Sequence, residues 1–265
     1  MNLEKLSIEV GNLSKEVGAN IIQQRLNFDP AVVVEKGLNQ LVSFVDIEAE
    51  KQLVKGLKKL IHEAGFITEE NTVEQLNTEL ELVWIIDPLD GTTNFIHNLP
   101  VYSISIALAK GNEILIGVVY EMGKKDLFSA WQNGGAWCNG EKISVTKTSE
   151  LSQSLIATGF PYYEFDQMEA YIKTLTYLMK NTHGLRRLGS AAVDLAYVAC
   201  GKFDAFFETG LNAWDVAAGC LLVQEAGGTV YDFKGENNFL FGKSITAGNV
   251  PVNAILNQLV QSNFK

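Results

Sequence analysis

Cysteine and histidine are scarce in this chain, and their scarcity excludes several kinds of site. Of the 265 residues only three are cysteine, and Cys138, Cys200 and Cys220 are far apart, without the C-x-x-C spacing of a zinc or redox motif. Neither a disulfide framework nor a zinc site is indicated, so we interpret them as buried thiols in a reducing cytoplasm. The three histidines share no spacing typical of a metal site or a catalytic triad.

Basic residues and long apolar runs are scarce as well. Lys and Arg number 21 against 31 Asp and Glu, which gives a formal net charge of -10 and a pI near 4.9. Nucleic acids and anionic membranes bind clustered Lys and Arg, so we exclude both as partners. No apolar run approaches membrane-spanning length, and the segment from Met1 to Leu6 lacks the basic and apolar blocks of a signal peptide. We therefore expect a cytoplasmic protein.

The apolar content, 47% of the residues, is ample for a sizeable core, and its spacing predicts the order of the elements. The first half should contain a helix from Leu3 that ends near Pro30, a strand over 32–34, a helix from Asp46 to a stop at Gly65, a strand over 82–86 and an antiparallel meander over 103–145. The second half should contain strands over 155–158 and 203–207 and helices over 167–179, 190–200 and 214–226.

The second half of the chain differs in pattern from the first. Near residue 146 the meander gives way to alternating strands and helices, and no repeat, low-complexity tract or Pro/Gly/Ser-rich linker separates the two parts. We predict two lobes that share an interface and form one compact catalytic unit with a cleft between them. They are an N-terminal α+β lobe over 1–146, which carries the metal-site motifs, and a C-terminal α/β lobe over 147–265.

The most informative stretch of the chain is Asp87-Pro88-Leu89-Asp90-Gly91-Thr92-Thr93-Asn94-Phe95. The apolar run before it predicts a buried strand, and Pro88 and Gly91 predict a turn at the end of that strand. Ligands of open α/β sheets bind beyond the carboxyl ends of the strands, and a helix that begins at 91–93 would direct free N–H groups at an anion. The combination indicates metal plus phosphate.

Taken alone, two acids three residues apart are more typical of a loop that caps a helix. Three further acidic segments, each beside an apolar run, favour a site instead: Asp46, Glu69-Glu70 and Trp214-Asp215. The succession of an acidic pair, D-P-x-D-G-T-T-N and W-D-x-A-x-G resembles the inositol monophosphatase family of magnesium-dependent, lithium-sensitive phosphatases, over nearly the whole chain. The resemblance implies an α/β fold, a layered αβαβα sandwich, with the metals at the cleft.

Matched residue by residue, the resemblance implies the roles of the site residues. The metal-ligand positions, for two or three Mg²⁺ ions, are Glu69, Asp87, the Leu89 carbonyl, Asp90 and Asp215. The catalytic positions are Asp46 and Thr92, which orient the nucleophilic water, together with Glu69 and Asp90. The substrate-binding positions are Asp90, Gly91, Thr92, Thr93, Ala191, Asp194, Glu208 and Asp215. Clustered carboxylates suit Mg²⁺, which takes hard oxygen ligands, and paired metals can hold the attacking and the leaving oxygen together.

Two positions depart from the family. Gln40 stands where a third-metal carboxylate is often found, which weakens the case for a third magnesium site and leaves the main pair intact. Thr68 precedes Glu69 where Gly is common, and no functional conclusion follows from it. Without the resemblance, Asp194 is more typical of a structural hydrogen-bonding group, and Arg186-Arg187 fits a subunit interface, a second substrate phosphate or a solvated face equally well.

We expect a phosphoric monoester hydrolase that acts on myo-inositol monophosphate, or a related polyol or sugar phosphate, through a metal-activated water. We also expect a homodimer. Fructose-1,6-bisphosphatase, adenosine 3',5'-bisphosphate phosphatase and histidinol-phosphate phosphatase share the fold and stay open, as does a catalytically silent regulatory homologue. A haloacid-dehalogenase-type phosphatase is rejected, because D-x-D-x-T spacing is one residue shorter than that of Asp87 and Asp90.

Overall fold

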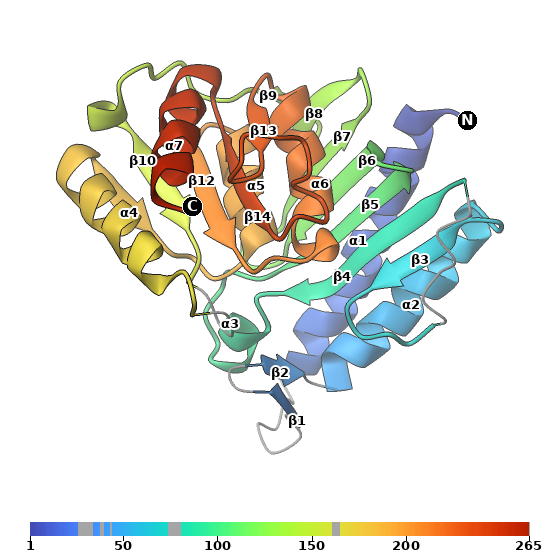
Figure 1. Ribbon diagram of the computed structural model, residues 1–265. Helices are drawn as coiled ribbons and strands as arrows, with labels where there is room; N and C mark the ends of the chain where they lie inside the picture. The colour runs from blue at the N-terminus through green and yellow to red at the C-terminus, as the bar shows by residue number, and fades with distance from the viewer. Residues whose placement is uncertain (26–33, 38–39, 43, 74–80, 161–164, 265) are drawn as a thin grey trace.

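Helices and sheets alternate in five layers in the computed structural model, which describes residues 1–25, 34–37, 40–42, 44–73, 81–160 and 165–264 (Figure 1). One pair of helices covers the outer face of a large sheet, a second pair fills the space between that sheet and a smaller one, and a third pair covers the smaller sheet. This is the αβαβα sandwich that the family resemblance implies, and the fold class is confirmed.

The large sheet has seven strands that follow the order of the chain. They are β3 (Gly65–Thr68), β4 (Val83–Asp90), β5 (Ser103–Lys110), β6 (Glu113–Glu121), β7 (Asp126–Trp131), β8 (Gly135–Cys138) and β9 (Glu141–Ile143). The pair β3–β4 is parallel and the other pairs are antiparallel, which confirms the meander. Helices α1 (Leu3–Arg25) and α2 (Phe44–Leu60) pack on each other and on its outer face.

The small sheet has five strands in the order β11-β10-β12-β14-β13. Their bounds are β10 (Leu155–Thr158), β11 (Gly184–Arg186), β12 (Ala205–Thr209), β13 (Thr229–Tyr231) and β14 (Ser244–Gly248). Its outer face carries α4 (Met168–Asn181) and α7 (Val250–Asn263). The chain also forms a two-stranded sheet of β1 (Val34–Gly37) and β2 (Gln40–Val42), the short helix α3 (Thr92–Ile96) and a 3₁₀ turn over Leu151–Gln153.

The middle layer consists of α5 (Ala191–Ala199) and α6 (Ala213–Glu225), which lie between the two sheets. Every residue of α5 is buried, as expected of a helix that is apolar on all sides. The first turns of both helices carry acids, Asp194 in α5 and Asp215 in α6. Asp194 is almost fully buried between the sheets, whereas Asp215 is half-buried.

Several predicted boundaries are wrong in detail. The strand expected over 82–86 continues through Pro88 to Asp90, and a shift in its pairing with β5 between Asp87 and Asp90 accommodates the proline. The second helix begins at Phe44, ahead of Asp46, and ends at Leu60, while Gly65 opens β3. The end of the first helix, and most of the strand over 32–34, lie outside the described residues.

The strands of the large sheet all precede residue 146 and those of the small sheet all follow it. The two lobes 1–146 and 147–265 nevertheless stay a prediction, because α6 packs on the large sheet and joins the halves closely. No helix in the described part of the chain combines the length and apolar content needed to cross a bilayer.

Candidate active site

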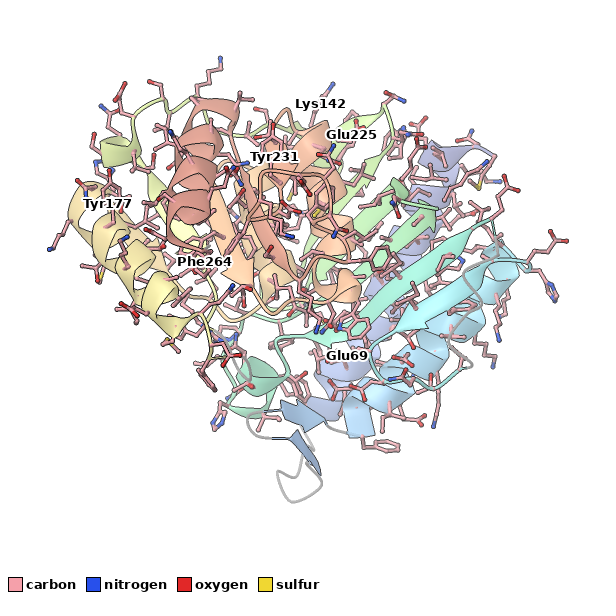
Figure 2. All side chains as sticks on the ribbon, viewed as in Figure 1. Glu69, Lys142, Tyr177, Glu225, Tyr231 and Phe264 are labelled. Carbon is pink, nitrogen blue, oxygen red and sulfur yellow. The ribbon has the colours of Figure 1, made fainter. Side chains whose placement is uncertain are left out.

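A cavity of about 900 Å³ brings most of the predicted site residues together. Nine of them line it: Glu69, Asp90, Gly91, Thr92, Thr93, Ala191, Asp194, Glu208 and Asp215. Asp46, Asp87 and the Leu89 carbonyl are not among the lining residues and contact this group from behind, as described below. Figure 2 places Glu69 on the lower side of the molecule as drawn, near the start of α2.

The end of β4 and the turn after it present the Asp90 carboxylate and the hydroxyls of Thr92 and Thr93 to the cavity. Asp87 is buried in the strand, and its Oδ1 accepts a hydrogen bond from the Leu89 N–H at 2.9 Å. Gly91 caps α3 with φ 94° and ψ 34°, and a Cβ there would lie 2.9 Å from the Val101 carbonyl oxygen. Only glycine meets both conditions easily, so the residue type at this turn follows from the backbone.

Thr92, the first residue of α3, is oriented by two oxygens. Its hydroxyl lies within donating distance of Asp46 Oδ1, at 3.1 Å, and of the Leu89 carbonyl, at 3.0 Å. Asp46 is fully buried in the first turn of α2, so this contact joins α2 to the end of β4. A buried carboxylate bonded to a hydroxyl at the cavity wall can accept a proton through that hydroxyl.

Asp90 is held by the start of α5. Its Oδ2 accepts hydrogen bonds from the Ser190 hydroxyl at 2.6 Å and from the Ala192 N–H at 2.8 Å. Burial raises the pKa of Asp90 to about 6, and the bonds from Ser190 and the backbone of 191–192 oppose that rise. The N-terminus of α5 favours the carboxylate form of Asp90. The two hydrogen bonds from this helix start also hold Oδ2 in place.

The other acids near Asp90 raise one another's pKa. Burial is the largest cause of the raised pKa of Asp87, followed by the charges of Glu69, Asp90 and Asp215. The pKa of Asp215 is also raised, by burial and then by Asp90, although its Oδ2 accepts the Asn212 N–H at 2.6 Å. The cluster therefore has an excess of negative charge that a bound cation would offset.

The donor atoms are of the kind that magnesium binds, but they are not arranged around a common point. They are carboxylate and carbonyl oxygens, which are the ligands Mg²⁺ prefers. Within the described residues, however, no group of three or more His, Cys, Asp or Glu side chains is arranged to hold a metal ion as it stands. A cation would have to draw these carboxylates closer together. Gln40 lies in β2, and its side chain is outside what the structure describes.

The opposite wall of the cavity carries two more buried carboxylates, Glu208 on β12 and Asp194 on α5. Burial raises the pKa of Glu208 to about 8, while Arg187 lowers it and Asp90 raises it. Burial, then Glu208 and Asp90, raise the pKa of Asp194. No described group forms a hydrogen bond with Asp194 Oδ1, so this oxygen is available to a donor on a ligand.

Three residues with a clear place at the site were missed from the sequence. Ser190 was expected only at a helix start, but its hydroxyl binds Asp90, 100 residues earlier. Gly159 lies against the Glu208 carboxylate so closely that a Cβ would overlap it. Glu50 lies within the helix predicted from Asp46 without a role of its own, yet it is buried and bonded to the loop that carries Glu69. Its spacing of four from Asp46 places both acids on one helix face, the only signal that could have found it.

Comparison with known proteins agrees with this geometry. The sequence pattern described as the inositol monophosphatase family matches residues 3–263. The chain is 41% identical over 231 residues to Nus factor SuhB of Escherichia coli strain K12, covering 87% of this chain and 86% of that protein. It is 39% identical over 226 residues to the inositol-1-monophosphatase of Mesorhizobium japonicum, covering 85% of each. The extragenic suppressor protein suhB of Bartonella henselae superimposes with a TM-score of 0.90 at 35% identity, covering 97% of this chain and 98% of that one.

Proposed function

The chain belongs to the inositol monophosphatase family, and from that premise we propose that it is a magnesium-dependent phosphatase that hydrolyses myo-inositol monophosphate or a related polyol or sugar phosphate. A phosphatase is what the family implies. The observation that carries the proposal is the cluster of buried acids around Asp87, whose mutual repulsion a divalent cation would relieve.

Glu69, Asp87, Asp90, Asp215 and the Leu89 carbonyl would hold the magnesium ions, two in number on the acids present. Bound magnesium would supply positive charge for the phosphoryl oxygens and acidify water at the site. The chain's own part is to keep these oxygens in position. The bonds to Asp87 from the Leu89 N–H, to Asp90 from Ser190, and to Asp215 from the Asn212 N–H do so without using any charged partner.

Asp46 and Thr92 would orient the water that attacks phosphorus. The Thr92 hydroxyl lies at the cavity wall within donating distance of Asp46 Oδ1, so it would accept a proton from that water while its own proton passes to the carboxylate. A threonine hydroxyl alone is too weak a base for this step. The burial of Asp46 keeps the relay apart from solvent.

The substrate would lie across the cavity with its phosphate at 91–93 and its alcohol near Glu208. The backbone and hydroxyls of Thr92 and Thr93 would bind the phosphate; α3 is only five residues long, so direct hydrogen bonds matter more than its dipole. Asp194 Oδ1 and the Glu208 carboxylate, which also line the cavity, are acceptors for hydroxyl groups, and Ala191 lies at the cavity wall with them. Two acceptors suit a polyol better than a second phosphate.

The alternative functions differ from this proposal in the leaving group of the substrate, or in whether the chain is an enzyme. Fructose 1,6-bisphosphate, adenosine 3',5'-bisphosphate and histidinol phosphate would present a second anion or a cation to this wall. Relatives named Nus factor SuhB raise the further possibility of a role outside catalysis, but the full set of expected acids in this chain favours an active enzyme. Lithium inhibition, a cytoplasmic location and a homodimer stay predictions.

The experiment that tests the proposal is phosphate release from a panel of esters in the presence of Mg²⁺. We expect inositol 1-phosphate to be turned over with a higher kcat/KM than fructose 1,6-bisphosphate, adenosine 3',5'-bisphosphate or histidinol phosphate. A wide preference for one of the latter would overturn the substrate and leave the reaction class standing. Release from none of them would overturn the enzyme.

A further inference from the structure

Glu50 is a buried acid of α2 that binds the loop following β3. Its side chain is 0% exposed. Oε1 accepts hydrogen bonds from the Thr68 hydroxyl at 2.9 Å and from the N–H and hydroxyl of Thr72, each at 2.7 Å. Oε2 accepts one from the Glu70 N–H at 2.7 Å. The carboxylate is thus satisfied by four donors from this one loop, and it does not line the cavity.

These four bonds fix the chain on both sides of Glu69. Thr68 supplies a donor on one side of Glu69, and Glu70 and Thr72 supply donors on the other. The backbone at Glu69 therefore has little freedom. Asn71 completes the turn with φ 53°, and its amide donates to the Glu69 carbonyl at 3.0 Å. The Glu69 side chain is directed to the cavity, where its charge raises the pKa of Asp87.

The same face of α2 supports a second wall of the cavity. Asp46 lies one helical turn before Glu50, and side chains spaced by four share a helix face. Asp46 accepts the Thr92 hydroxyl, whereas Glu50 accepts the donors of the loop 68–72. Figure 1 shows α2 running alongside β3, which delivers that loop. One helix therefore sets the relative positions of Thr92 and Glu69.

Thr68 gives this chain an additional bond to Glu50. Its side chain is fully buried, and its hydroxyl reaches Oε1 at 2.9 Å. A glycine at this position would have no hydroxyl to donate. One of the four donors that hold the loop therefore exists because residue 68 is threonine.

We propose that Glu50 is a positioning residue for magnesium: by holding the loop 68–72, it keeps the Glu69 carboxylate where a metal ion can use it. The inference rests on the proposed function, because it assigns Glu69 to the metal. Groups that orient metal ligands through hydrogen bonds commonly contribute to metal affinity without touching the ion. Glu50 accordingly affects how tightly Mg²⁺ binds and leaves the chemistry of the loaded enzyme largely unchanged.

The test compares Glu50→Gln and Thr68→Val with two matched controls. Glutamine keeps the shape of Glu50 but replaces one acceptor oxygen by a donor, and valine keeps the shape of threonine without its hydroxyl. Thr68→Ser retains the hydroxyl. Glu48→Gln changes a neighbouring acid of α2 that pairs with Lys51. Mg²⁺ is titrated into each metal-free protein by calorimetry, and kcat is measured at saturating Mg²⁺.

We expect Glu50→Gln to weaken Mg²⁺ binding by about tenfold or more, in line with the usual cost of losing an orienting group. Thr68→Val should weaken it by a smaller factor, while both controls bind as the wild type does. In each variant kcat at saturating Mg²⁺ should stay within a few-fold of wild type. Amide exchange at 70 or 72 should become faster in Glu50→Gln, because glutamine keeps only one acceptor oxygen and one of these two N–H groups loses its acceptor.

Wild-type Mg²⁺ affinity in both variants would overturn the inference, as would a loss confined to kcat at saturating Mg²⁺. If Glu50→Gln does not fold, Thr68→Val decides alone. A wild-type protein that binds no Mg²⁺ would overturn the proposed function and this inference with it. Normal magnesium binding and activity in the wild type, with no effect in the variants, would overturn this inference only.

Discussion

The Glu208 carboxylate lies directly on Gly159, so the cavity wall has room for this acid only because residue 159 has no side chain. The three atoms nearest to a Cβ at 159 would all belong to the end of the Glu208 side chain, and the Cβ would overlap each of them. Such an overlap is relieved by a rotation of Glu208 away from the cavity. The position of the Glu208 carboxylate in the cavity wall therefore depends on a glycine at 159.

Gly159→Ala is predicted to change specificity more than stability. Because the flexible Glu208 can move aside, the melting temperature should stay close to wild type, while turnover of inositol 1-phosphate falls. A simple ester such as p-nitrophenyl phosphate, which has no hydroxyls for Glu208, is the control substrate. Equal losses on both substrates, or a large drop in melting temperature, would show that the glycine serves packing and not recognition.

Glu208→Ala should reproduce this pattern in a stronger form. A buried polar group left without its partner costs about 1–3 kcal/mol, so kcat/KM for inositol 1-phosphate should fall about tenfold or more. The rate on p-nitrophenyl phosphate should change little, since the groups that contact phosphate remain. Steady-state kinetics on both esters check this, and a uniform loss would assign Glu208 a structural role.

Thr92→Ala should separate water activation from metal binding. Removing the hydroxyl breaks the bond to Asp46, and general-base assistance is typically worth roughly 10²–10⁴-fold, so kcat should fall within that range. Thr92→Ser, which keeps the hydroxyl, should retain much more activity. Mg²⁺ affinity should stay within a few-fold in both variants. Wild-type turnover in Thr92→Ala would remove this residue from the mechanism.

The metal-free protein should become less stable as the pH rises. Burial raises the pKa of Asp90 to about 6 and that of Glu208 to about 8, and also raises those of Asp87 and Asp215. In the unfolded chain these acids have pKa values of about 4. Between that pH and the raised folded-state pKa, the folded protein binds more protons than the unfolded chain, so the free energy of unfolding decreases as the pH rises through this range. The melting temperature measured in chelator should therefore be higher at about pH 5 than at about pH 8. No change with pH would contradict the electrostatic picture of the cluster.

Much of the fold is predictable from the sequence because most elements have local signals. Leu6, Val10, Val17 and Ile21 recur at helical spacing and are buried in α1. The end of β4 is different: Pro88 is a local signal to stop, but the bulged pairing with β5 lets the strand continue to Asp90. Tertiary pairing overrides a local preference there, and no window of residues contains that information.

The site was predictable as a set of residues and less so as a set of contacts. The motif over 87–95 contributes Asp90 to the cavity, and the other expected acids that line it lie outside the motif: Glu69, Asp194, Glu208 and Asp215. The bond from Ser190 to Asp90 and the bonds from the loop 68–72 to Glu50 join distant elements, and neither has a periodic signal. Glu50 in particular has the appearance of a surface acid in the sequence, since only the folded loop supplies the donors that allow its burial.

The central claim, that the acid cluster is a magnesium site that drives phosphate release, is tested most directly by adding Mg²⁺ back to chelator-treated protein while following two quantities on one sample. We expect no release of phosphate from inositol 1-phosphate without metal. As Mg²⁺ is added, activity and melting temperature should rise together, because a ligand at 100 times its Kd stabilises the native state by about 2.7 kcal/mol. Asp87→Asn should lose both responses, and the exposed Glu141→Gln should keep both. Full activity and an unchanged melting temperature in chelator would contradict the account.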